Sequence, residues 1–87
     1  MIMENSGKSI RPAESHVFIK PQESHQLDIL FNNMNRCSLR YDLDMHSGFV
    51  TRCGKYTAPN RQGNFTVRIS CAEDNSIDTE VCFIVRE

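Results

Sequence analysis

The sequence predicts an all-β protein, an antiparallel sandwich of about seven short strands. Apolar and polar residues alternate in several runs, which is the pattern of strands with one face on a core and one in water. Turn-forming residues separate these runs, and no window of useful length repeats apolar residues at helical spacing. At 87 residues the chain is long enough for one small domain with a thin core.

The first half of the chain divides into a leader and two strands. Residues 1–15 mix Ser, Gly, Pro and charges without periodicity, so we expect a flexible leader ahead of a domain that covers residues 16–87. The first predicted strand is 16–20, and Pro21 ends it because proline cannot donate to a ladder. Residues 26–31 alternate as a second, half-buried strand, and an Asn-rich turn follows at 32–35.

The second half of the chain contains the clearest alternation. Residues 37–44 place apolar side chains at odd positions and polar ones at even positions. Two shorter strands, 48–51 and 55–58, flank Gly54, and a turn-rich connection follows at 59–63. The last two predicted strands are 65–71 and 79–85, separated by a turn in the segment 73–78.

Charge, hydropathy and size argue against several classes of function. Ten Lys and Arg residues oppose eleven Asp and Glu residues, so the chain lacks the basic excess of a nucleic-acid-binding protein. No apolar run approaches the roughly 20 residues that span a bilayer, so we expect no membrane insertion. A deep catalytic cleft needs more surrounding structure than a chain of this size provides, so we expect no enzyme.

The four cysteines do not have metal-ligand spacing. Zinc sites use closely spaced cysteine or histidine pairs, and the sequence contains none, so we expect no metal and no cofactor. A Cys–His nucleophile also lacks the glycine-flanked setting that activates a thiol. The acidic segment 73–78 offers oxygen ligands for calcium, but it lacks the dense ligand alternation of a calcium loop, and we favour a plain turn.

One segment resembles a known family. Gly48-Phe49-Val50-Thr51-Arg52-Cys53-Gly54-Lys55-Tyr56-Thr57-Ala58-Pro59, followed by Gly63-Asn64-Phe65-Thr66-Val67, is similar to the bacterial immunoglobulin-like (Big) domains. The similarity extends over residues 17–87, although Tyr41 stands where that family usually has Trp. The residues that carry it read as structural: Gly48, Gly54 and Gly63 suit unusual backbone angles, and Tyr56 buries a ring with a polar tip. Thr57, Ala58 and Pro59 complete the motif where the chain passes between sheets.

The resemblance implies an immunoglobulin-like sandwich and a non-catalytic role. Such domains are spacers or adhesion modules of bacterial surface proteins and phage particles, which places this chain at the cell surface or outside the cell. The partner is then a protein or a surface carbohydrate bound by the loops 32–36, 59–63 and 73–78, since loops carry function on a rigid scaffold. We expect the isolated domain to be monomeric.

The sandwich also predicts that two cysteines are neighbours. If strand 37–43 runs antiparallel beside strand 65–71, Leu43 lies opposite Phe65 and Cys37 lies opposite Cys71, within bridging distance. Their oxidation state depends on the cellular compartment. Cys82 is out of phase with the apolar residues of its strand and is expected to face outward.

A second hypothesis belongs to a different class. The chain starts at Met1, shows no signal-peptide core and carries four thiols, which suits a free-standing, cytoplasmic ligand-binding or thiol-responsive protein. A ligand-dependent or thiol-dependent shift in melting temperature would distinguish such a sensor from a spacer.

Overall fold

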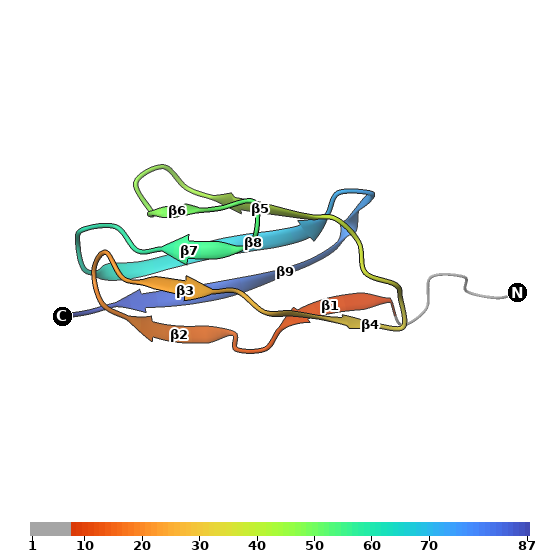
Figure 1. Ribbon diagram of the computed structural model, residues 1–87, viewed down its shortest axis with the longest axis horizontal. Coiled ribbons are helices and arrows are strands. Elements are labelled where there is room, and N and C mark those ends of the chain that lie inside the picture. The colour runs from red at the N-terminus through yellow and green to blue at the C-terminus, as the bar shows by residue number, and fades with distance from the viewer. Residues whose placement is uncertain (1–7) are drawn as a thin grey trace, which may run out of the picture.

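The computed structural model describes residues 8–87, and in that range it contains nine strands and no helix (Figure 1). None of the described residues belongs to a helix that is long and apolar enough to cross a membrane. The strands are β1 (Ser9–Pro12), β2 (His16–Ile19), β3 (Ser24–Gln26), β4 (Ile29–Asn32), β5 (Leu39–Leu43), β6 (Phe49–Val50), β7 (Lys55–Thr57), β8 (Gly63–Cys71) and β9 (Asp74–Val85).

The largest sheet has four strands in the order β2-β9-β8-β5. Its centre is the long β8–β9 hairpin, in which the alternating residues predicted for 65–71 and 79–85 pair antiparallel. β5 joins β8 antiparallel, whereas β2 joins β9 parallel. The predicted antiparallel arrangement is therefore wrong for the pair β2–β9.

Two smaller sheets complete the fold. A three-stranded sheet, β3-β7-β6, lies over the β8–β9 hairpin, and β1 pairs with β4 in a two-stranded sheet at one end of the molecule (Figure 1). The layers meet where Tyr56 of β7 stacks on Phe83 of β9, with ring centroids 3.9 Å apart. Both rings are fully buried, so this pair forms the middle of the core.

The rest of the core comes from one face of each strand. The ends of β8 and β9 that follow residues 66 and 80 bury alternate apolar residues, as alternation predicts, and Ser70 of β8 is buried as well. The buried apolar residues are Ile10, Val17, Ile19, Leu27, Tyr56, Ala58, Val67, Ile69, Cys71, Val81, Phe83 and Val85.

The strand count exceeds the expected number of about seven for two reasons. First, Ser9–Pro12 form β1 and bury Ile10, so the flexible leader expected over residues 1–15 is wrong for this part; residues 1–7 lie outside the described range. Second, the segment 26–31, expected as a single strand, contains the end of β3 and the beginning of β4, and these two strands belong to different sheets. Leu27 and Asp28 connect them.

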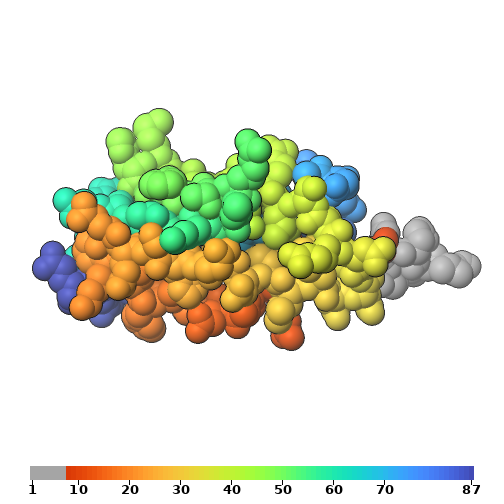
Figure 2. Space-filling view, in the orientation of Figure 1, coloured from red at the N-terminus to blue at the C-terminus, as the bar shows by residue number. Residues whose placement is uncertain are grey.

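The molecule is elongated. Its radius of gyration is 14.0 Å, compared with about 12 Å for a compact chain of this length. β1 begins at one end of the long axis and β9 finishes at the other (Figure 1). The space-filling view has the same outline, and the segment between β5 and β6 projects from its upper edge (Figure 2).

Candidate functional site

Tyr56 and Gly48 form the centre of the motif that the sequence singled out. The Tyr56 hydroxyl donates a 2.6 Å hydrogen bond to the carbonyl oxygen of Ser47, inside the protein. Gly48 has φ +96°, and a Cβ added there would collide with the carbonyl oxygen of Thr57. Only glycine combines this backbone angle with so close an approach, so the β5–β6 connection can pass over the end of β7.

The next three motif residues attach β7 to β3. The Thr57 hydroxyl lies 3.0 Å from the Ser24 hydroxyl, and the Ala58 amide donates to the carbonyl of Glu23. The Pro59 carbonyl accepts from the Gln22 amide at 3.3 Å. These three contacts are made within the fold, which is a structural role.

The other two glycines lie apart from this cluster. Gly54, with φ +88°, leaves space for the hydroxyl of Tyr41, which would be 2.6 Å from an added Cβ. Gly63 begins β8 and lies against the ring of Phe65. The motif residues thus occupy several separate places in the fold and do not converge on one site.

Cys37 and Cys71 are joined in a disulfide with their Cα atoms 5.8 Å apart. The expected pairing register is wrong by two residues, because Cys71 lies opposite Leu39 and Val67 lies opposite Leu43. Cys37 precedes β5 and reaches Cys71 diagonally. A slip of two residues keeps each side chain on its own face, so hydrophobic alternation alone cannot fix this register.

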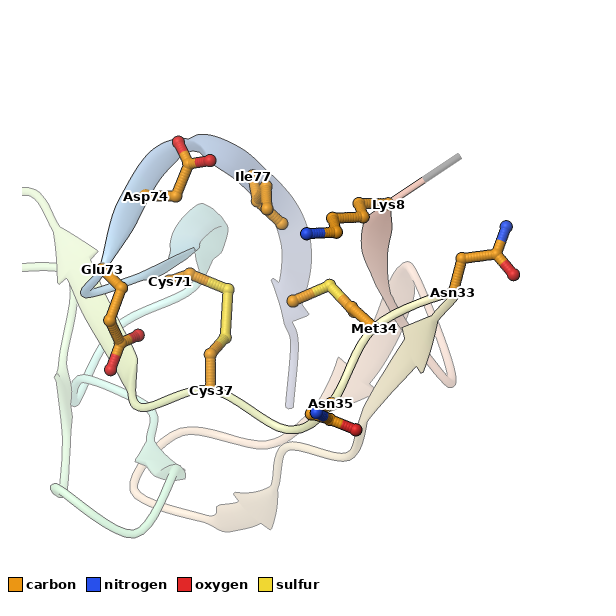
Figure 3. A pocket seen from close by; sticks show the side chains of 9 residues that line it. All are labelled: Lys8, Asn33, Met34, Asn35, Cys37, Cys71, Glu73, Asp74 and Ile77. Atoms are coloured by element: carbon orange, nitrogen blue, oxygen red, sulfur yellow. A yellow bond between two sulfur atoms is a disulfide. The ribbon is translucent and has the colours of Figure 1, made fainter. Parts of the chain in front are cut away.

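An open depression of about 650 Å³ lies beside the disulfide (Figure 3). Lys8 and Met34 point across it toward the disulfide, Ile77 points into it from β9, and Asn33 points away (Figure 3). The remaining lining residues are Asn35, Glu73 and Asp74. This combination of amide, carboxylate and ammonium groups around apolar side chains can bind a polar ligand, but it presents no activated nucleophile.

Two of the three expected recognition loops meet at this depression, since 33–35 and 73–77 both line it. The third, 59–63, contributes Pro59, Asn60 and Arg61 to a separate hollow that Gln22 and Phe49 also line. The expectation of a loop over 73–78 is wrong, because β9 begins at Asp74 and the hairpin turn is Ala72–Glu73. A two-residue hairpin turn lets both strands extend to the end of the ladder.

The charged groups of the 73–78 segment interact locally. Hydrogen bonds from the hydroxyl and the backbone amide of Ser76 lower the pKa of Asp74. The Nε and Nη2 atoms of Arg68 both donate hydrogen bonds to Oδ2 of Asp78, at 3.0 and 2.6 Å. Among residues 8–87 no group of three or more His, Cys, Asp or Glu side chains is placed to hold a metal ion.

The two remaining cysteines are free thiols: Cys53 is exposed, and Cys82 is partly buried on β9. Cys53 lies at the surface beside Tyr41, and burial together with this thiol raises the pKa of the Tyr41 hydroxyl. Met34 belongs to the expected loop 32–36, whereas Lys8 was not expected at any site. The sequence offers no signal for Lys8, because it comes from a segment without periodicity and meets Met34 only through the β1–β4 pairing.

Comparison with known protein families and with curated proteins finds no match for the chain.

Proposed function

We propose that the chain is an immunoglobulin-like sandwich module that acts without catalysis, as a spacer or adhesion unit of a bacterial surface or phage protein. The observation that carries the proposal is the placement of the two ends of the fold. β1 begins at one end of an elongated body and β9 finishes at the other (Figure 1). Copies or neighbouring domains connected through these ends would extend a stalk.

The strand order supports the immunoglobulin-like part of the proposal. In such sandwiches the second, fifth and fourth strands form one sheet, and the third, sixth and seventh form the other. The sheet β3-β7-β6 and the strands β5, β8 and β9 follow this scheme once β1 and β2 are taken together as the first strand and β4 as a continuation of β3. The Gly48 to Gly63 motif that resembles Big domains supports the same assignment.

The disulfide supports a location outside the cytoplasm. Cys37 and Cys71 are 34 residues apart, and their bond closes a long loop in a domain with a thin core. Disulfides persist at cell surfaces, in the periplasm and on particles, and are rare where thiols are kept reduced. A stalk that is exposed to the medium gains most from such a crosslink.

Recognition would use the end that carries the disulfide. The depression there combines the loop 33–35 with the β8–β9 turn, and its polar lining suits a protein surface or a carbohydrate. The substitution Asn35→Ala is expected to weaken binding to the cell or glycan surface, and Asn64→Ala, at an exposed position of β8 outside the three loops, serves as the matched control.

An antibody blot of fractionated source cells tests the proposal. A spacer or adhesion unit gives a band far above 10.0 kDa in the envelope or particle fraction. A band at 10.0 kDa that is confined to the cytosol contradicts the proposal.

The second candidate is a thiol-responsive or ligand-binding protein of the cytoplasm, and the exposed Cys53 thiol next to Tyr41 favours it. Reduction of the disulfide lowers the stability of a spacer as well, so a response to reductant does not distinguish the two functions. The discriminating experiment modifies Cys53 in a Cys37→Ala/Cys71→Ala variant. A sensor shifts its melting temperature on modification, and a spacer does not.

A further inference from the structure

β5 is an open edge of the four-stranded sheet, since it pairs with β8 on one side only. None of the backbone hydrogen bonds outside the sheet ladders of residues 8–87 involves Leu39–Leu43. The other edge strand, β2, is flanked by Pro12 and Pro21, which discourage further pairing, whereas no proline lies near β5. β5 is therefore the edge of this sheet that can accept another strand.

The hydrogen-bonding direction along β5 follows from the pairing register. The Ala72 amide donates to the carbonyl of Ser38 at 2.8 Å, so Ser38 directs its backbone groups toward β8. Hydrogen-bonded and non-hydrogen-bonded pairs alternate along an antiparallel ladder, so Arg40 and Asp42 also bond to β8. Leu39, Tyr41 and Leu43 then direct their amide and carbonyl groups toward the open edge.

We propose that two copies of the chain associate through β5, antiparallel and with Tyr41 at the two-fold axis. Tyr41 then lies opposite its counterpart, and Leu39 lies opposite Leu43 of the second copy as a hydrogen-bonded pair. Arg40 lies opposite Asp42 of the second copy in a non-hydrogen-bonded pair, where side chains are closest. The two sheets become one continuous sheet across the interface.

Charge complementarity selects this partner and this register. Arg40 and Asp42 are both exposed, and neither takes part in an ion pair among residues 8–87. A two-fold axis at Arg40 would place two arginines opposite each other, and an axis at Asp42 would place two aspartates opposite each other, both of which are unfavourable. Only the axis at Tyr41 pairs both charges with their opposites within β5.

The interface is compatible with the proposed spacer but does not depend on it. β5 runs along the side of the body, so pairing would join two modules laterally and leave their ends accessible (Figure 1). The disulfide fastens the chain just ahead of β5 to β8, which holds the edge in shape for a partner. The proposal departs from the expectation that the isolated domain is monomeric, because the sequence alone does not reveal that β5 is an open edge.

Sedimentation velocity on the full chain tests the proposal. A Cys53→Ser background removes the exposed thiol, so that a dimer cannot arise from an intermolecular disulfide at that position. Because a single strand edge is a small interface, the concentration series runs from about 10 µM to about 1 mM. We expect a reversible monomer–dimer equilibrium within this range, and a protein that stays monomeric throughout overturns the proposal.

Charge reversal tests the register. Arg40→Asp and Asp42→Arg each place like charges opposite each other in the homodimer, and we expect each to weaken association by at least about tenfold. An equimolar mixture of the two variants restores both opposite-charge pairs and is expected to form a heterodimer. The double variant Arg40→Asp/Asp42→Arg is expected to form homodimers again.

The control is Arg11→Asp, which makes the same charge change at an exposed position of β1. It is expected to dimerise like the parent protein, and circular dichroism verifies that every variant is folded. Dimerisation that is unaffected by Arg40→Asp, or a mixture that fails to associate, overturns the proposed pairing.

Discussion

At the scale of single residues, the Tyr56 hydroxyl is a polar group with a hydrogen bond inside the core. Its ring is stacked on Phe83, and its hydroxyl satisfies the carbonyl of Ser47 at 2.6 Å. We expect Tyr56→Phe to lower the free energy of unfolding by about 1–2 kcal/mol, because it leaves a buried carbonyl without a partner. Urea unfolding measures the change.

The matched control is Tyr41→Phe, because the Tyr41 hydroxyl makes no hydrogen bond among residues 8–87 and its side chain is half buried. It is expected to change stability much less. Equal losses for the two variants would show that the bond to Ser47 does not contribute.

The raised pKa of Tyr56 makes the stability of the fold depend on pH in the alkaline range. Burial raises its pKa from 10.0 to about 12. As the pH rises, the unfolded state therefore loses the Tyr56 proton before the folded state does. The stability contributed by the neutral phenol is complete below pH 10.0 and is lost between pH 10.0 and about 12. The free energy of unfolding, measured by urea unfolding at several pH values across this interval, should fall less steeply with pH for Tyr56→Phe than for the parent protein. An identical pH dependence in the two proteins would contradict the raised pKa of Tyr56.

Gly48 and Gly54 provide a graded test of backbone packing. At Gly48 an added Cβ meets a backbone carbonyl of β7, and at Gly54 it meets the end of the Tyr41 side chain. A side chain can move aside and a ladder carbonyl cannot. Gly48→Ala is therefore expected to cost more than about 2 kcal/mol and to cost more than Gly54→Ala. Thermal melts of both variants give the order, and the reverse order would refute the argument.

At the scale of elements, the disulfide holds the open edge strand to the rest of its sheet. Closing a loop between residues 34 positions apart stabilises a fold by about 3–4 kcal/mol. Reductant should lower the melting temperature of the parent protein, and it should leave the already destabilised Cys37→Ala/Cys71→Ala variant unchanged. A similar effect of reductant on both proteins would point to another thiol.

The long, regular strands are the elements that the sequence predicts best. Alternation locates β5, β8 and the second half of β9, because each turns one apolar face toward the core, although that face is only partly buried in β5. It cannot locate β1, which buries only Ile10, and it joins β3 to β4, because Leu27 and Ile29 continue the same alternation through the break between sheets.

The candidate site depends on contacts between residues that are distant in the sequence, and local sequence patterns do not predict such contacts. The sequence predicts that Cys37 and Cys71 lie near each other, and the structure joins them through a different register. Asp74, Asn75 and Ser76 resemble a turn in composition, but all three belong to β9. Asp74 pairs with Cys71, and residues 75–77 form an irregularity in the ladder before pairing with β8 resumes at Asp78. Tertiary pairing decides such segments, because strand propensity is weak and depends on context.

At the scale of the whole molecule, the fold is an elongated unit in which β1 begins at one end and β9 finishes at the other (Figure 1). Two copies joined from residue 87 of the first to residue 8 of the second should then extend in line. Arg40→Asp in both copies prevents lateral pairing through β5, which would otherwise fold the tandem back on itself.

Small-angle X-ray scattering of this tandem is the most direct test. We expect a maximum dimension about twice that of the single copy, as for two rigid domains joined end to end. A tandem with a maximum dimension close to that of the single copy would contradict the proposed spacer function.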